Sequence, residues 1–106
     1  MRQVFIDEFN VPKEAYEEFV RRMNYNRNFI RKLKGFIEDR GFFKTDEKEN
    51  VTVITMAIWE SEEVLNSAKE AVQAEYKRIG FNPAEMMERL HIIMKRDIYF
   101  ELEKPD

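Results

Sequence analysis

An α+β fold built on one four-stranded antiparallel sheet is predicted by three features of the sequence. Four segments are rich in strand-forming or alternating apolar residues, and segments with the 3.6-residue period of a helix lie between them. Serine, asparagine, proline and glycine stand where these helices should begin and end. The chain has 106 residues, 43% of them hydrophobic and 37% charged, which indicates a single globular domain over residues 1–106 with a frayed tail at 103–106.

The N-terminal third predicts a strand followed by a helix. Residues 3–11 are apolar at most positions, as in a strand. Pro12 suits the first turn of a helix, and the acids that follow it favour a helix N-terminus. The apolar stripe of this helix runs to Leu33. We expect the helix to be kinked or broken near Asn26, because the asparagines within 24–28 compete for backbone hydrogen bonds.

Two further strands, at 36–45 and 50–60, form a predicted β-hairpin across the short polar loop DEKEN. The second of these strands carries apolar side chains on both faces. Val51, Val53, Ala57 and Trp59 point one way, and Ile54, Met56 and Ile58 point the other. A sheet that is apolar on both faces must be covered on both. The helices of so small a protein cover one face, so we expect a second copy of the chain to cover the other.

The C-terminal half predicts two helices and a last strand. Ser61 caps the first helix and Gly80 ends it, while Asn82 begins a short second helix with Glu85 as partner in a capping box. The last strand is expected over 92–102, with four apolar residues on one face: Met94, Ile98, Phe100 and Leu102. The order strand, helix, strand, strand, helix, short helix, strand is the split βαβ pattern of the ferredoxin-like fold.

Composition excludes several kinds of site. The chain has no cysteine, which excludes disulfides, thiolate metal sites and a cysteine nucleophile, and its single histidine excludes a multi-histidine metal site within one chain. A net charge of −3 gives no general attraction to nucleic acid or to an anionic membrane. The N-terminus predicts a strand rather than a signal peptide, and no apolar run approaches the roughly 18 residues that cross a bilayer. We therefore expect a cytoplasmic protein that binds neither nucleic acid nor membrane.

Two turns resemble those of a known family. Residues 33–36 read L-K-G-F and lead into a predicted strand, while residues 58–63 read I-W-E-S-E-E and lead into a predicted helix. Both turns resemble those of the antibiotic biosynthesis monooxygenases, which are dimeric α/β-barrel proteins, and the resemblance covers about residues 4–102. It implies a homodimer whose two sheets pack face to face into a barrel, with a pocket between each sheet and its own helices. Members of the family include cofactor-free oxygenases of polycyclic phenols and quinols, haem-degrading enzymes, and small proteins with no established reaction.

No cofactor is expected on the basis of this resemblance. In the haem-degrading branch, the iron ligand is a histidine on the second main helix, where this chain has Lys69, Glu70 and Gln73. That branch also has an asparagine within the first strand, near the place that Asp7 and Glu8 occupy here. These departures make haem binding an unfavoured interpretation, so we predict a protein that works without cofactor or metal.

Trp59 and His91 are the first candidate site residues. Trp59 stands at the tryptophan position of the family and would line the pocket. Alternatively, it packs the strand-to-helix corner with its indole N–H bonded to backbone. Histidine exchanges a proton readily near neutral pH, so His91 is a candidate general base. The competing explanation for His91 is a residue at the end of the short helix, where the helix dipole favours it.

Asp7 is the second candidate for the base, because it shares a strand face with two phenylalanines and a carboxylate among aromatic rings is poorly hydrated. It could instead lie at an exposed edge or pair with Arg96 across the sheet. Tyr16 and Tyr76 lie on the inward stripes of the two main helices. Either could line the pocket and donate a hydrogen bond to a phenolic substrate, or be a core tyrosine with a satisfied hydroxyl.

Three functions follow as hypotheses. The first is a cofactor-independent monooxygenase of the antibiotic biosynthesis type, acting on an aromatic or quinol-like small molecule. The second is a non-catalytic dimeric module that binds a small ligand or only assembles. The third is an anion-binding regulator that uses the basic stretch 21–34, which has four arginines, two lysines and no acid. A solvated helix face, balanced by acids elsewhere, is the competing explanation for that stretch.

Overall fold

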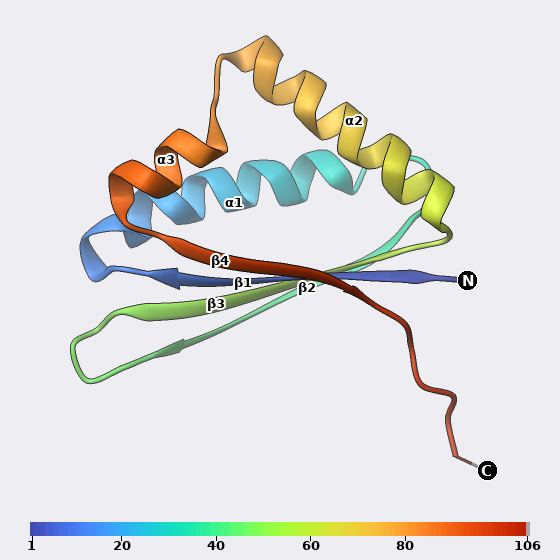
Figure 1. Cartoon of the computed structure of the whole chain (residues 1–106), viewed down its shortest axis with the longest axis horizontal. Coiled ribbons are helices and arrows are strands. Elements are labelled where there is room, and N and C mark those ends of the chain that lie inside the picture. Colours follow the sequence, from blue (N-terminus) through green and yellow to red (C-terminus); the bar gives the residue numbers. More distant parts are fainter. Residues whose placement is uncertain (106) are drawn as a thin grey trace.

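The computed structural model describes residues 1–105 and has the predicted α+β architecture (Figure 1). Along the chain, the elements are β1 (Gln3–Val11), the short 3-10 helix η1 (Lys13–Ala15), α1 (Tyr16–Ile30), β2 (Phe36–Thr45), β3 (Val51–Trp59), α2 (Glu62–Ile79), α3 (Pro83–Leu90) and β4 (Ile93–Tyr99). The four strands form one sheet in the order β2-β3-β1-β4, and all neighbours are antiparallel. This is the split βαβ topology of the ferredoxin-like fold.

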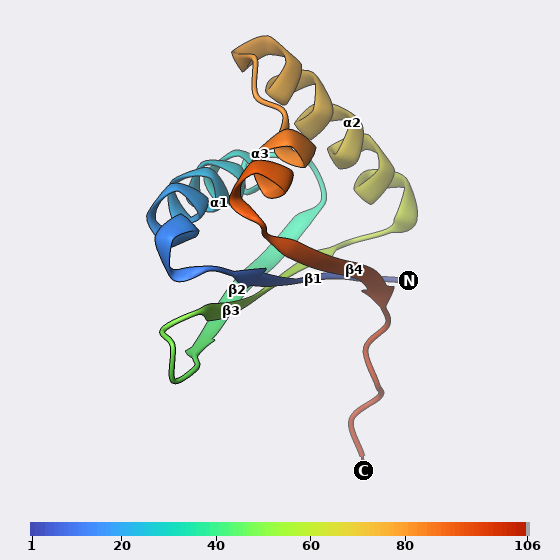
Figure 2. The same cartoon turned by 60° about the vertical axis from the view of Figure 1, so that its left-hand side comes forward.

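The helices lie on one face of the sheet, as Figures 1 and 2 show from two directions. Side chains at alternate strand positions therefore meet different surroundings. On β3, Val51, Val53, Ala57 and Trp59 point toward the helices and belong to the core. Ile54 and Met56 point the other way, toward a face that no helix of residues 1–105 covers. The expectation that the helices cover only one face is confirmed.

The predicted helix ends are present. The Ser61 hydroxyl accepts a hydrogen bond from the Val64 N–H at 3.3 Å, and the Asn82 side-chain oxygen accepts one from the Glu85 N–H at 3.1 Å. Gly80 ends α2 in the left-handed conformation, with φ of 69°. Local sequence signals thus fix where α2 and α3 begin and where α2 ends.

The predicted kink near Asn26 is wrong, because α1 runs without interruption from Tyr16 to Ile30. Packing onto the sheet outweighs the weak helix propensity of asparagine. Phe19 and Ile30 are buried near the two ends of the helix and hold it against the sheet. Asn26 itself lies on the buried side, where it faces a cavity described below.

The predicted extent of the last strand is also wrong. β4 ends at Tyr99, and the chain then leaves the sheet as an extended tail (Figure 2). Met94 and Ile98 lie on the helix-facing side, opposite Phe9 and Phe5 of β1. Phe100 and Leu102 continue the alternation in the sequence only, because the pairing of β4 with β1 ends at Val4 and Tyr99.

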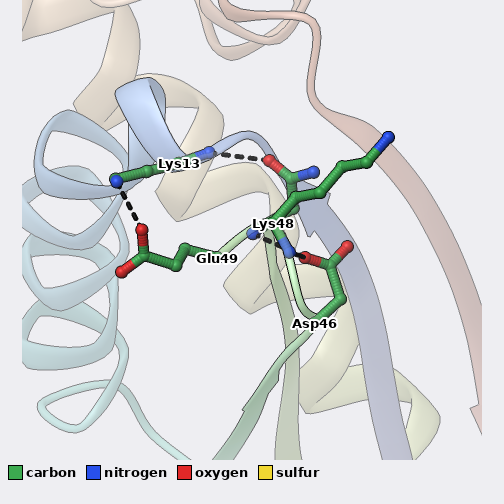
Figure 3. A network of polar contacts seen from close by, with 5 residues as sticks. Lys13, Asp46, Lys48 and Glu49 are labelled. Carbon is green, nitrogen blue, oxygen red and sulfur yellow. Dashed lines mark hydrogen bonds and ion pairs between the residues drawn. The ribbon is translucent and has the colours of Figure 1, made fainter.

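A polar network anchors the β2–β3 loop to the start of the first helix (Figure 3). The Asp46 carboxylate accepts hydrogen bonds from the N–H groups of Lys48 and Asn50, at 2.8 and 3.0 Å, which closes the loop. The Asn50 side chain accepts from the Lys13 N–H at 3.1 Å, and the Lys13 ammonium pairs with Glu49. The hairpin is thereby tied to the segment that connects β1 with α1.

The two turns that carry the family resemblance form one structural unit. The Glu60 N–H, in the turn after β3, donates to the Gly35 carbonyl, in the turn after α1, at 2.9 Å. Phe36 meets Trp59 edge to face, with ring centroids 5.6 Å apart. Gly35 has a φ of 83° and lies against the first turn of α2, so that a Cβ there would come within 2.5 Å of Val64. Only glycine fits this position without displacing α2.

We therefore expect Gly35→Ala to destabilise the protein more than Gly80→Ala does. Both glycines have a positive φ, which costs an alanine about 1–2 kcal/mol, but a Cβ at Gly80 would meet nothing within 4 Å. At Gly35 the overlap with Val64 adds about 1–3 kcal/mol. Urea denaturation of the two variants measures the difference in the free energy of unfolding, and equal losses would show that the contact with Val64 has no energetic weight.

Candidate functional site

A cavity of about 530 Å³ lies between the sheet and its helices. All four strands and the three α-helices, with the α2–α3 connection, contribute to its lining, which is mainly apolar and includes Phe5, Phe9, Trp59 and five methionines. The cavity runs between two separate groups of core residues. One group surrounds Val11, Phe19 and Met86, and the other surrounds Trp59 and Leu65. The protein thus has a divided core with a space large enough for a small organic molecule between its halves.

A polar row crosses the floor of the cavity at the middle of the sheet. The strand register places Arg96 of β4 opposite Asp7 of β1, and Asp7 opposite Thr55 of β3. Asp7 is 9% exposed, and the Arg96 guanidinium donates to both of its carboxylate oxygens, at 2.7 and 3.0 Å. The pairing of Asp7 with Arg96 that the sequence allowed is therefore present, and it is bidentate, the strongest geometry for such a pair.

The same row ends on β2 at Gly41, which lies opposite Thr55. The space above Gly41 holds the Arg27 guanidinium, because a Cβ there would be 3.2 Å from Arg27 Nη1. Arg27 pairs with the Asp39 carboxylate at 2.5 Å, and Arg31 donates to the other Asp39 oxygen at 2.9 Å. Burial alone would raise the pKa of Asp39, but the hydrogen bonds and charges of the two arginines hold that pKa below its ordinary value of 3.8.

Two buried polar atoms on the cavity lining have no hydrogen-bond partner within residues 1–105. They are the indole nitrogen of Trp59 and the side-chain oxygen of Asn26. Trp59 is 2% exposed, and the interpretation in which its N–H bonds to backbone is wrong. A buried polar group without a partner costs about 1–3 kcal/mol, so each atom could form a hydrogen bond with a ligand group that reaches it.

Tyr76 reaches the cavity from α2 and is half-buried. Its ring meets Phe81 edge to face, with centroids 5.2 Å apart. Burial raises the pKa of the Tyr76 phenol. The positive charges of Arg96 and Arg22 oppose this rise, and the negative charge of Asp7 adds to it. The Tyr76 hydroxyl is therefore protonated at neutral pH and can donate a hydrogen bond. It lies close enough to the polar row for the charges of Asp7 and Arg96 to affect its pKa.

The structure brings together only some of the residues that the sequence singled out. Asp7, Trp59 and Tyr76 line the same cavity. His91 does not, since it ends α3 in a left-handed conformation and lines a separate, shallow pocket beside the β2–β3 loop. Tyr16 packs against the core group around Phe19 and is also absent from the cavity lining.

Several members of the site were not predicted, among them Asn26 and Thr55. Asn26 occurs with Phe19, Met23 and Ile30 at helical spacing, and a polar residue on such a stripe is a signal for a buried polar site. Thr55 joins the row because of a strand register that the sequence does not give.

The cavity lining contains no histidine, and within residues 1–105 no three His, Cys, Asp or Glu side chains gather closely enough to hold a metal ion. No helix in the part of the chain that the structure describes is long and apolar enough to span a membrane.

Comparison with known proteins identifies the fold. No family model matches the chain, and no curated protein matches its sequence. Among solved structures, a candidate monooxygenase from Shewanella loihica PV-4 superposes with a TM-score of 0.69, at 19% identity, over 97% of this chain and 96% of that one. SnoaB, a cofactor-independent oxygenase from Streptomyces nogalater, superposes in a mutant form with a TM-score of 0.67, at 16% identity, over 97% and 95% of the chains.

A candidate antibiotic biosynthesis monooxygenase from Nitrosomonas europaea gives a TM-score of 0.67 at 14% identity, over 95% of this chain and 90% of that one. These proteins share one fold with this chain. The resemblance seen in the two turns is therefore confirmed at the level of the fold, while identities of this size carry no chemistry with them.

The Asp39 pairs generate a prediction about pH. Because the pKa of Asp39 is lower in the folded state, its ionised form contributes stability above pH 3.8, and this contribution is lost as the pH falls through the folded-state pKa. We expect Asp39→Asn to lower the free energy of unfolding by about 2 kcal/mol at pH 7. The difference from the unmodified protein should shrink below pH 4.

Denaturation curves at pH 7 and pH 3 test this expectation, with Glu47→Gln as control because Glu47 is exposed and lies in the hairpin loop. A loss for Asp39→Asn that is equal at both pH values would contradict the assignment of the stabilising charge to Asp39.

Proposed function

We propose that the cavity binds a flat aromatic, quinol-like molecule and that the protein oxygenates it without a cofactor. The observation that carries this proposal is the unpartnered indole N–H of Trp59 in the wall of an aromatic cavity. A cavity of about 530 Å³ suits a ligand of this size, since small-molecule sites commonly measure roughly 300–1,000 Å³. The description of SnoaB as a cofactor-independent oxygenase supports the same chemistry on the same fold.

In the proposed reaction, a phenol of the substrate gives its proton to Asp7. The resulting phenolate makes the ring carbon opposite it electron-rich, and that ring reduces dioxygen directly. The phenolate carbon and the ring carbon opposite it become the two carbonyls of a quinone. One atom of dioxygen supplies the new carbonyl oxygen, and the other leaves as water with the hydrogen of that ring carbon and the proton that Asp7 took up. Arg96 holds the Asp7 carboxylate in place through two hydrogen bonds, so Arg96 is a positioning residue.

The same arrangement can stabilise the charge that develops on the substrate oxygen. The Trp59 N–H and the Tyr76 hydroxyl are donors on the cavity lining, and a donor in a poorly hydrated site stabilises an anion better than one in water. The apolar walls exclude water from the electron-rich ring, which protects it until it meets dioxygen.

A non-catalytic binding module is the second candidate function, and one observation favours it. Both carboxylate oxygens of Asp7 are already bonded to Arg96, and His91 lies outside the cavity, so the site has a single candidate base that is tightly held. Such a protein would bind the same aromatic molecules and release them unchanged.

Oxygen uptake by the purified protein with a panel of anthrones and quinols separates the two candidates. An oxygenase should lose about 100-fold or more of its turnover in Asp7→Asn and about tenfold or more in Trp59→Phe, while circular dichroism shows that both variants fold. His91→Ala should retain full activity, because His91 does not line the cavity. Absence of oxygen uptake with every member of the panel would favour the binding module.

We propose further that the bare face of the sheet is the interface of a homodimer. Its apolar residues come from all four strands, and the most exposed of them are Phe42, Ile93 and Tyr99, at 48, 64 and 52%. Ile54 and Met56 form the middle of the same face. A second copy of this surface is the covering that the apolar pattern of β3 requires.

Phe42→Lys should convert the dimer to a monomer, since it places a charge within the proposed interface. Phe43→Lys is the matched control: Phe43 is the neighbouring residue and is 69% exposed, but it points to the opposite face of the sheet. Sedimentation velocity of the two variants gives the oligomeric state. A monomeric unmodified protein, or equal effects of the two substitutions, would contradict this interface.

A further inference from the structure

The cavity carries more positive than negative charge, although the whole chain has a net charge of −3. Its lining includes four cationic side chains, Arg22, Arg27, Lys69 and Arg96, and two carboxylates, Asp7 and Asp39. Both carboxylates are already bonded to arginines of the same lining, Asp7 to Arg96 and Asp39 to Arg27. The excess therefore consists of two positive charges, which belong to Arg22 and Lys69.

Arg22 and Lys69 have no carboxylate within 4 Å in the part of the chain that the structure describes. Glu18, one helical turn before Arg22, is instead bonded to Arg89. Both cations lie over aromatic rings of the lining: the Arg22 guanidinium is 4.2 Å from the centre of Phe81, and the Lys69 ammonium is 5.2 Å from that of Phe5. Both residues are exposed, and these contacts keep their charges beside aromatic rings of the cavity lining.

The basic stretch that stood out in the sequence is divided by the fold. Arg21 pairs with Glu17, and Arg27 and Arg31 pair with Asp39. Of the four arginines in this stretch, only Arg22 both lines the cavity and has no carboxylate partner among residues 1–105. Its position on α1, with Lys69 on α2, puts one free cation on each of the two long helices that border the cavity.

We infer that the ligand of this cavity is an aromatic carboxylate, with its rings between the sheet and the helices and its carboxylate at Arg22 and Lys69. This inference rests on the proposed function, because it names the class of molecule that the same cavity takes. The apolar lining would contact the ring system, and the Trp59 N–H would donate a hydrogen bond to one ring oxygen. The two free cations select for a negative charge, since a neutral analogue leaves both without a partner.

A pair of probes of equal shape tests the charge selection. Anthraquinone-2-carboxylate and anthraquinone-2-carboxamide differ in charge, and Trp59 is the only tryptophan, so quenching of its fluorescence reports occupancy of the cavity. We expect the carboxylate to bind about tenfold more tightly than the carboxamide at low ionic strength, with the ratio falling as salt is added.

Charge-removing variants locate the selection. Arg22→Gln and Lys69→Gln should each weaken binding of the carboxylate about threefold to tenfold and leave binding of the carboxamide unchanged. Arg21→Gln and Lys77→Gln are the matched controls, because they remove the same charge from exposed positions of the same helices outside the cavity lining. These controls should bind both probes as the unmodified protein does.

Each other result decides against the inference. Equal affinities for the two probes would overturn it and leave the proposed function intact, because the cavity would still bind aromatic molecules. Equal losses in the control variants would assign the selection to overall charge and also overturn it. If neither probe binds, the proposed function fails together with the inference.

Discussion

The contact of Gly35 with the first turn of α2 determines how the rest of the molecule is arranged. Through it, the end of α1, the start of β2 and the start of α2 meet at one corner, where the Glu60 N–H donates to the Gly35 carbonyl at 2.9 Å. Trp59 closes this corner against Phe36. A side chain on residue 35 would push α2 away from the corner, and the cavity wall that α2 provides would move with it. The residues that carry the family resemblance thus fix the frame of the site rather than its chemistry.

Within that frame, the cavity exists because polar groups interrupt the core. Asp7 and Arg96 satisfy each other at the middle of the sheet, and Arg27 lies over Gly41 at the far end of the same row. Asp7 is buried and the Arg96 side chain is half-exposed, so the attraction between them does little more than offset the lost hydration of Asp7. Apolar side chains cannot close over charged groups without leaving them unsolvated, so the two apolar groups of the core stay apart. The division of the core is the physical reason why the fold has a cavity.

The sequence alone predicted what depends on neighbouring residues and missed what depends on distant ones. Ser61, Gly80 and Asn82 marked helix ends correctly because capping is local. The supposed break at Asn26 was wrong because contact with the sheet, which no local pattern encodes, keeps α1 straight through the asparagines. The alternation of apolar residues predicted a strand that continues past Tyr99, whereas the pairing of β4 with β1 ends at that residue. The same reasoning explains the site: Asp7, Trp59 and Tyr76 were identified by residue type, but only the strand register and the helix positions show that they share a cavity that His91 does not reach.

A fold shared with known oxygenases does not determine the reaction of this protein. Individual atoms of the cavity, above all the indole nitrogen of Trp59, indicate whether a ligand binds there. An indole N–H that served only to pack a corner would be expected to find a backbone acceptor, because most buried donors in proteins do. At Trp59 the N–H is buried and unpartnered among the described residues, next to an aromatic space of suitable size. An unpartnered donor of this kind costs about 1–3 kcal/mol, and a ligand oxygen that reaches it would recover this free energy.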